Sequence, residues 1–258
     1  MLKKVFFFVT FLVVFTSYPQ FDDTVPKAKL FDDINDIGVL IQTLAKDKLY
    51  IISGLKKGRA KKELDNALST INESISEIDL NEDDIEIQNQ LKKIKEFWTK
   101  FNKSSVQKLD YKEYSNVYFQ VNTFERMVSD LSQKMFEVYQ LDGEKYANYQ
   151  DIQKLRKLIQ MLTVSYYAKH LDLSKNFLHQ YQKNIAEIDN FIKEKSNVFL
   201  NDPVTEGFFQ DFILDWNFFR ANLLHPSIKN PKTVFSLSNS IDYQLFKVKN
   251  KYIDLLKN

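Results

Sequence analysis

The sequence predicts an all-α protein built from two tandem antiparallel four-helix bundles of up-down topology, with an elongated overall shape. Glycine and proline are scarce, with five of each in 258 residues, whereas β-sandwiches and barrels need many turn residues. Apolar residues recur at alternating spacings of three and four along most of the chain, a pattern typical of helices packed in a bundle. The two halves of the chain also align with each other.

Four apolar stripes divide the first half into helices. They consist of Ile34, Ile37, Ile41 and Leu44; Leu64, Leu68, Ile71, Ile75 and Ile78; Ile87, Leu91, Ile94, Trp98 and Phe101; and Val121, Phe124, Val128, Leu131, Met135 and Val138. The segments between them carry Gly54 and Gly58, the acidic run 81–84, and residues 102–105. These residue types are typical of helix ends and caps.

Four further stripes predict four helices in the second half. They consist of Ile152, Leu155, Ile159, Leu162 and Tyr166; Leu178, Tyr181, Ile185, Ile188 and Ile192; Phe209, Phe212, Trp216, Phe219 and Leu223; and Ile241, Leu245, Val248, Tyr252 and Leu255. Pro203 precedes the third of these helices, and Pro226 and Pro231 follow it. Proline is tolerated at such positions and would break the interior of a helix.

The two halves align with each other at a nearly constant offset. Trp98 and Trp216, the only tryptophans, lie 118 residues apart, and the same offset matches residues 40–42 to residues 158–160. With a slip of one residue, Asn122 matches Asn239. Agreement between separate segments indicates a tandem duplication. We therefore expect one bundle over residues 25–141 and a second over residues 145–258. The bundles could stack end to end, but Gly143 favours a kink between them.

The first twenty residues have the features of an export signal. Lys3 and Lys4 precede an apolar run from Val5 to Phe15, which has the length of a signal-peptide core and is short for a membrane span. We interpret residues 1–20 as a signal peptide and expect a periplasmic or secreted protein. An uncleaved membrane anchor is the alternative interpretation.

Composition and motifs argue against several functions. The chain has no cysteine, and its 36 basic and 34 acidic residues give a net charge of only +2, which does not indicate a nucleic-acid partner. No nucleophile elbow, phosphate-binding loop or zinc-protease motif is present. The three histidines have neither Glu-x-x-His spacing nor a helical i, i+4 partner. We therefore expect a protein that is not an enzyme and that has no metal site and no cofactor.

Two acidic pairs, Asp32-Asp33 and Asp83-Asp84, are interpreted as residues at helix starts that complement the helix dipole. A set of polar residues lies on or beside the first helix of each half. It consists of Asn35, Gln42, Arg156 and Gln160. Polar groups buried between helices would specify register or contact a ligand. Exposure of these groups to water is the alternative.

A short motif connects the chain to a known family. The first helix carries Ile34-Asn35-Asp36-Ile37-Gly38, and the third helix carries Trp98. This arrangement resembles the helical sensor domain of type IV pilus chemotaxis transducers, a group that includes the PilJ-type domain and the NarX-type nitrate sensor domain. The second copy keeps Ile152 and Trp216, with Gln153 in place of the Asn and Arg156 in place of the Gly. The resemblance runs from about residue 30 to the C-terminus and implies two degenerate copies of such a domain.

The sequence also departs from that family. Basic residues just after the Gly contact the anion at a subunit interface in the nitrate-sensing members, and Val39 and Ile41 stand at those positions here. In the second copy Lys157 occupies the first position and Ile159 the second. Nitrate is therefore disfavoured, and Arg156 with Lys157 keep an anion site open in the second bundle. The family's transducers continue into signalling modules, whereas we expect a sensory module without its own signalling domain.

These observations predict an exported, non-catalytic, sensor-like binding module. Its ligand site would comprise Asn35, Gln42, Arg156, Lys157 and Gln160. The expected partners are a small anion or metabolite, or an exported or membrane protein, and a homodimer is left open. The alternative function is a structural or protein–protein interaction bundle with no small-molecule ligand.

Overall fold

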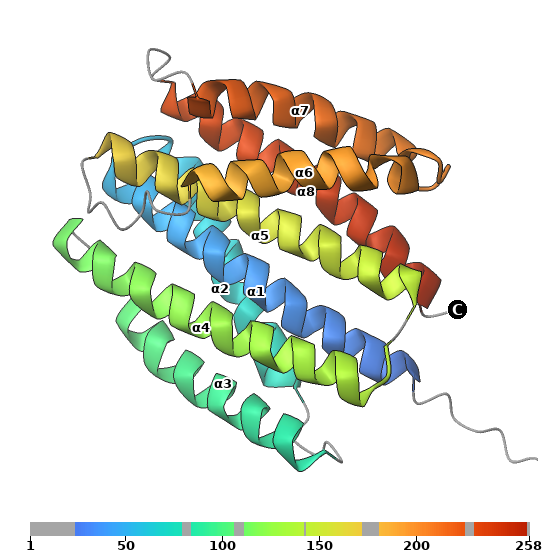
Figure 1. Ribbon diagram of the computed structural model, residues 1–258. Helices are drawn as coiled ribbons and strands as arrows, with labels where there is room; N and C mark the ends of the chain where they lie inside the picture. The colour runs from blue at the N-terminus through green and yellow to red at the C-terminus, as the bar shows by residue number, and fades with distance from the viewer. Residues whose placement is uncertain are drawn as a thin grey trace, which may run out of the picture.

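Eight helices make up nearly all of the residues that the structure, a computed structural model, describes: 24–78, 84–105, 111–141, 143–171, 181–224 and 230–256 (Figure 1). The predicted signal peptide, residues 1–20, and the side chains of the three histidines lie outside the described part. The helices are α1 (Thr24–Ile52), α2 (Lys57–Glu77), α3 (Ile85–Ser105), α4 (Tyr111–Val138), α5 (Glu144–His170), α6 (Tyr181–Leu200), α7 (Glu206–Leu224) and α8 (Pro231–Leu256). The all-α prediction is confirmed.

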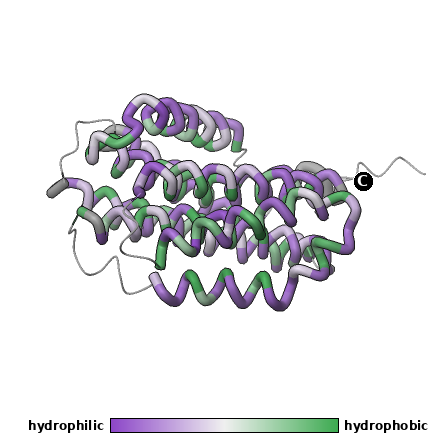
Figure 2. Tube along the Cα trace, turned by 90° about the horizontal axis from the view of Figure 1, so that it is seen from above, coloured by the Kyte–Doolittle hydropathy of each residue, from purple (hydrophilic) through white to green (hydrophobic). Residues whose placement is uncertain are grey.

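Most residues of the predicted apolar stripes are buried in the hydrophobic core between the helices. Ile34, Ile37, Ile41 and Leu44 are fully buried, and so are Phe209, Phe212 and Phe219 on α7. Along the helices, hydrophobic and hydrophilic residues alternate from one side of the helix to the other, as expected for amphipathic helices packed in a bundle (Figure 2). Leu178 and the side chain of Leu255, which belong to two predicted stripes, lie outside the described part.

Side chains and glycines mark the helix ends as expected. The Asp84 carboxylate accepts hydrogen bonds from the backbone N–H groups of Glu86 and Ile87, both at 2.9 Å, and so caps α3. Gly54 after α1 and Gly143 before α5 have φ values of 73° and 102°. These left-handed values are accessible to glycine at little cost. The chain turns back at Gly143, so that α4 and α5 run in opposite directions (Figure 1).

The two halves repeat one arrangement of four helices. In the first half α1 packs against α2 and α4, and α4 against α3; in the second, α5 packs against α6 and α8, and α8 against α7. The tryptophans occupy equivalent places in both halves. Trp98 Nε1 donates to Asn72 Oδ1 on α2 at 2.8 Å, and Trp216 Nε1 donates to Asp189 Oδ1 on α6 at 3.0 Å. This equivalence agrees with the predicted duplication.

The halves lie side by side, and the end-to-end arrangement left open by the sequence is not adopted. The two first helices, α1 and α5, run parallel and touch along their length (Figure 1). Nearly equivalent residues face each other: the rings of Phe31 and Tyr149 lie 5.6 Å apart, and those of Tyr50 and Tyr167 lie 3.7 Å apart. Such pairing of like positions is the geometry of a parallel twofold dimer, here within one chain.

No helix in the described part of the chain combines the length and the apolar character that a membrane crossing requires.

Gly38, in the family-like motif, lies where α1 is close to both α4 and α5. A Cβ atom at this position would come within 3.3 Å of Val128 Cγ1 on α4 and 3.7 Å of Lys157 Cδ on α5. The absence of a side chain therefore lets α1 pack against α4 and α5 together.

We predict that Gly38→Leu lowers the free energy of unfolding by at least about 1–3 kcal/mol, because the new side chain overpacks this junction. Gly207 on α7 is the matched control, since a Cβ atom there meets nothing within 4 Å. Gly207→Leu should change the same quantity by no more than about 0.5 kcal/mol. Urea denaturation followed by circular dichroism measures both, and equal effects would contradict the tight junction.

Candidate binding site between the two halves

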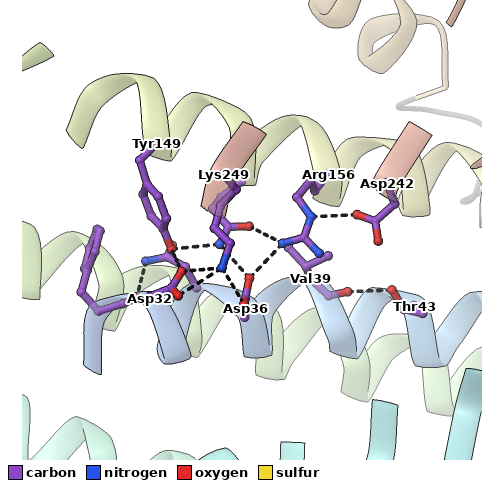
Figure 3. Close-up of polar contacts among 11 residues, drawn as sticks. Asp32, Asp36, Val39, Thr43, Tyr149, Arg156, Asp242 and Lys249 are labelled. Atoms are coloured by element: carbon purple, nitrogen blue, oxygen red, sulfur yellow. Dashed lines mark hydrogen bonds and ion pairs between the residues drawn. The ribbon is translucent and has the colours of Figure 1, made fainter. Parts of the chain in front are cut away.

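A network of buried charges joins α1 to α5 and α8. Asp36 on α1 accepts hydrogen bonds from Arg156 Nη1 at 2.9 Å and from Lys249 Nζ at 3.0 Å. Asp32, one turn earlier, accepts from Lys249 Nζ at 2.8 Å and from the Tyr149 hydroxyl at 2.7 Å. These groups converge from three helices between the halves (Figure 3). The α1 helix contributes the acids, and α5 and α8 contribute the bases.

Two further contacts complete the network. Arg156 Nε donates to Asp242 Oδ1 on α8 at 2.8 Å, and the Gln153 amide donates to Asp36 at 2.9 Å. Arg156 and Lys249 are only 5% and 2% exposed. Charges removed from water in this way destabilise a fold unless each is paired, and here each base meets two carboxylates.

The network shifts the pKa values of its members in different directions. Burial raises the pKa of Asp32, and the nearby negative charge of Asp36 adds to this effect. Burial acts on Asp36 as well, but the charges of Arg156 and Lys249 outweigh it and hold the pKa of Asp36 below its usual range. Asp36 therefore stays ionised and anchors both bases.

A second polar cluster lies further along α1, near its C-terminal end. Lys46 Nζ donates to the side-chain oxygen of Asn239 on α8 and lies 3.8 Å from Glu63 Oε2 on α2. The Asn239 amide in turn donates to Glu63 at 2.8 Å. Asp47 is fully buried beside them, and among the described residues neither of its carboxylate oxygens accepts a hydrogen bond, although Lys46 Nζ lies 3.7 Å from Oδ1. Burial raises the pKa of Asp47 to about 7.

A groove of about 330 Å³ opens between the two polar clusters. Its walls come from α1, α2, α5 and α8, so both halves contribute to it. The lining residues are Leu40, Thr43, Lys46, Glu63, Asn66, Ala67, Thr70, Arg156, Asn239, Asp242, Tyr243 and Phe246. Tyr243, on the rim, is 55% exposed. The groove can hold a small ligand in contact with both charged groups and aromatic rings.

The five predicted site residues are distributed along α1 and α5, and only Arg156 lines this groove. Asn35 donates to the Phe31 carbonyl and accepts from Ser132, and Gln42 donates to Asn122 on α4. Lys157 pairs with Glu125 at 3.0 Å and also donates to Ser129. These three side chains thus join α1 or α5 to α4.

Gln160 is 1% exposed, and neither atom of its amide has a hydrogen-bond partner in the described part of the chain. Gln160 is the counterpart of Gln42 in the second half. The counterpart of Asn122 in the predicted alignment is Asn239, which is engaged with Lys46 and Glu63 of the first half. The second copy has therefore exchanged an internal hydrogen bond for contacts between the halves.

Sequence reasoning missed Asp32, Asp36, Lys46 and Lys249 as members of the clusters. The interpretation of Asp32-Asp33 as a helix start is wrong, because α1 begins at Thr24 and Asp32 lies in its third turn. Asp84 does cap a helix as interpreted. A signal was available on α1: Asp32, Asp36, Thr43 and Lys46 follow helical spacing and form a polar stripe beside the apolar one.

Within the described residues no group of three or more His, Cys, Asp or Glu side chains is placed to hold a metal ion. The fold and the groove define a class: an all-helical protein of two repeats packed side by side, with a small polar groove at their junction. No protein-family model matches the chain, and no curated protein or solved structure is significantly similar to it.

We predict that Lys249→Met lowers the free energy of unfolding at pH 7 by about 3–5 kcal/mol, because it leaves Asp32 and Asp36 close together without their shared counter-charge. Lys29→Met is the matched control. Lys29 pairs with Glu77 at 3.4 Å, with both side chains more than half exposed, and its loss should cost less than about 1 kcal/mol. Chemical denaturation of both variants distinguishes them, and a small effect at Lys249 would contradict a stabilising role for the network.

We also predict that Asp47→Asn raises stability in a pH-dependent way. The folded state keeps the Asp47 proton up to about pH 7, whereas the unfolded chain releases it near its ordinary pKa of 3.8. The stability that this raised pKa contributes is therefore fully present below about pH 4 and is lost as the pH rises through 7. The variant should match the wild type near pH 4 and exceed it by about 1–4 kcal/mol at pH 8.

The control for this experiment is Asp65→Asn, at an exposed position of α2. Denaturation curves at pH 4, 6 and 8 should show no pH-dependent difference between Asp65→Asn and the wild type. A difference between Asp47→Asn and the wild type that does not grow with pH would show that Asp47 ionises normally in the folded protein.

Proposed function

We propose that this protein is a non-catalytic, sensor-like binding module that holds a small molecule in the groove between its two halves. The observation that carries the proposal is the composition of the groove. Lys46 and Arg156 are 1% and 5% exposed, yet both reach a cavity lined by residues from both halves. Buried charges at the edge of a cavity are costly for stability alone and are common where a protein recognises a polar ligand.

The resemblance to PilJ-type and NarX-type sensor domains also supports a ligand site between the two halves. It implies recognition at the contact between two first helices, and α1 and α5 are in contact here. Because the two copies are fused, the proposed site needs no second chain. The resemblance also implies an exported protein, and the apolar run at residues 5–15 supports that part of the proposal.

The alternative function, a protein–protein interaction bundle, is favoured by one observation. Leu214 and Phe218 lie one turn apart on α7 and are 58% and 64% exposed. Neighbouring apolar side chains in water can receive a partner helix. This surface lies on α7, away from the groove residues, so the two functions can be tested separately.

A thermal-shift screen of the purified protein against small anions, amino acids and other metabolites tests the proposal. A ligand at about 100 times its dissociation constant should add about 2.7 kcal/mol and raise the melting temperature by roughly 2–4 °C. Asn66→Trp should abolish the shift, because Asn66 is an exposed groove residue of α2 and a Trp there fills the groove.

Asp65→Trp, at the adjacent exposed position that does not line the groove, should leave the shift unchanged. A shift that survives Asn66→Trp would place the ligand elsewhere. A flat screen would contradict small-molecule binding and favour the interaction bundle, which Leu214→Ser and Phe218→Ser variants would then test in a pull-down.

A further inference from the structure

The charged groups of the groove keep unused hydrogen-bonding capacity after the network has formed. Arg156 donates to its partners through Nε and Nη1, and Nη2 makes no hydrogen bond to the described residues. Asp242 accepts through Oδ1, and its Oδ2 accepts no hydrogen bond from the described residues. Arg156 and Asp242 both line the groove. A donor and an acceptor of opposite charge are therefore available to a ligand at neighbouring positions.

The whole lining of the groove is electrically balanced. Its charged residues are Lys46 and Arg156, which are positive, and Glu63 and Asp242, which are negative. A simple anion drawn to the two bases would also meet the two carboxylates, and a simple cation would meet the two bases. A ligand that carries one charge of each sign gains from both sets, because each of its charges can lie beside the opposite charge.

The rest of the groove is apolar or neutral and small. Leu40 and Ala67 contribute aliphatic surface, and Tyr243 and Phe246 contribute aromatic surface. A volume of about 330 Å³ lies at the lower end of the range for small-molecule sites, which suits a ligand of amino-acid size. Phe246 is held in place by Arg156, whose guanidinium carbon lies 5.1 Å from the centre of its ring.

We propose that the groove binds a free α-amino acid with an apolar side chain. Its carboxylate accepts from Arg156 Nη2, its ammonium group donates to Asp242 Oδ2, and its side chain lies against Tyr243 and Phe246. This assignment rests on the proposed function and adds the class of ligand. It also gives the paired Arg156 and Asp242 a shared role, since their mutual hydrogen bond keeps the two free atoms side by side.

Isothermal titration calorimetry of the protein with three matched compounds tests the assignment: leucine, 4-methylpentanoate, which lacks the amino group, and isoamylamine, which lacks the carboxylate. Leucine should bind at least ten-fold more tightly than either of the other two. Asp242→Asn should weaken leucine binding at least ten-fold and leave 4-methylpentanoate binding unchanged or stronger. Asp215→Asn, on α7 outside the groove, is the matched control and should change the binding of neither leucine nor 4-methylpentanoate.

Tyr243→Ala keeps the test informative if Asp242→Asn does not fold. Tyr243 is 55% exposed, so its removal leaves the core intact, and leucine binding should weaken several-fold. Equal binding of leucine and 4-methylpentanoate would overturn the amino-acid assignment in favour of an anion site. Binding of another metabolite class, blocked by Asn66→Trp, with no amino acid bound would also overturn the assignment and leave the proposed function standing. Absence of any ligand would overturn both.

Discussion

The structure depends on the contact between α1 and α5, the first helices of the two halves. Both helices are buried on most of their sides, because each packs against its own bundle and against the other. A charge on the buried faces of these helices must therefore be paired within the protein. Asp36, Arg156 and Lys249 satisfy this requirement together, and the ring contacts at Phe31 and Tyr50 close the contact on either side.

The difference in sequence between the two halves explains how this contact can be complementary. In a symmetric dimer, like positions on the two first helices would carry identical residues, so acids on one helix would face acids on the other. In this chain the two halves differ at these positions. The first carries Asp32 and Asp36, and the second carries Tyr149, Gln153 and Arg156 opposite them. Two non-identical halves in one chain thus permit pairing of opposite charges across a nearly symmetric contact.

The same difference creates the groove. Asn239 of α8 hydrogen-bonds Lys46 and Glu63 of the first half, while the Gln160 amide of its own half makes no hydrogen bond to the residues that the structure describes. The α8 helix is thereby held beside α2, and Arg156 and Asp242 line the cavity between the halves. The proposed binding of a small zwitterion follows from the placement of Arg156 and Asp242 in the second half, and the first half completes the groove with Leu40, Lys46, Glu63 and Ala67.

The sequence by itself determined the helices, the Asp84 cap of α3 and the internal similarity of the two halves. The helices follow from the spacing of apolar residues that are close together in the chain. The similarity of the halves follows from their alignment at a nearly constant offset. The sequence also singled out Asn35, Gln42 and Lys157 on the first helices, and their side chains do make polar contacts with α4. Only the tertiary structure decided that the halves lie side by side and that Asp32, Asp36 and Lys46 belong to the junction. The partners of these residues are more than 100 positions away in the chain, except Asp47 and Glu63, which pair with Lys46. A charge on a helix has the same local sequence pattern whether it faces water or an opposite charge.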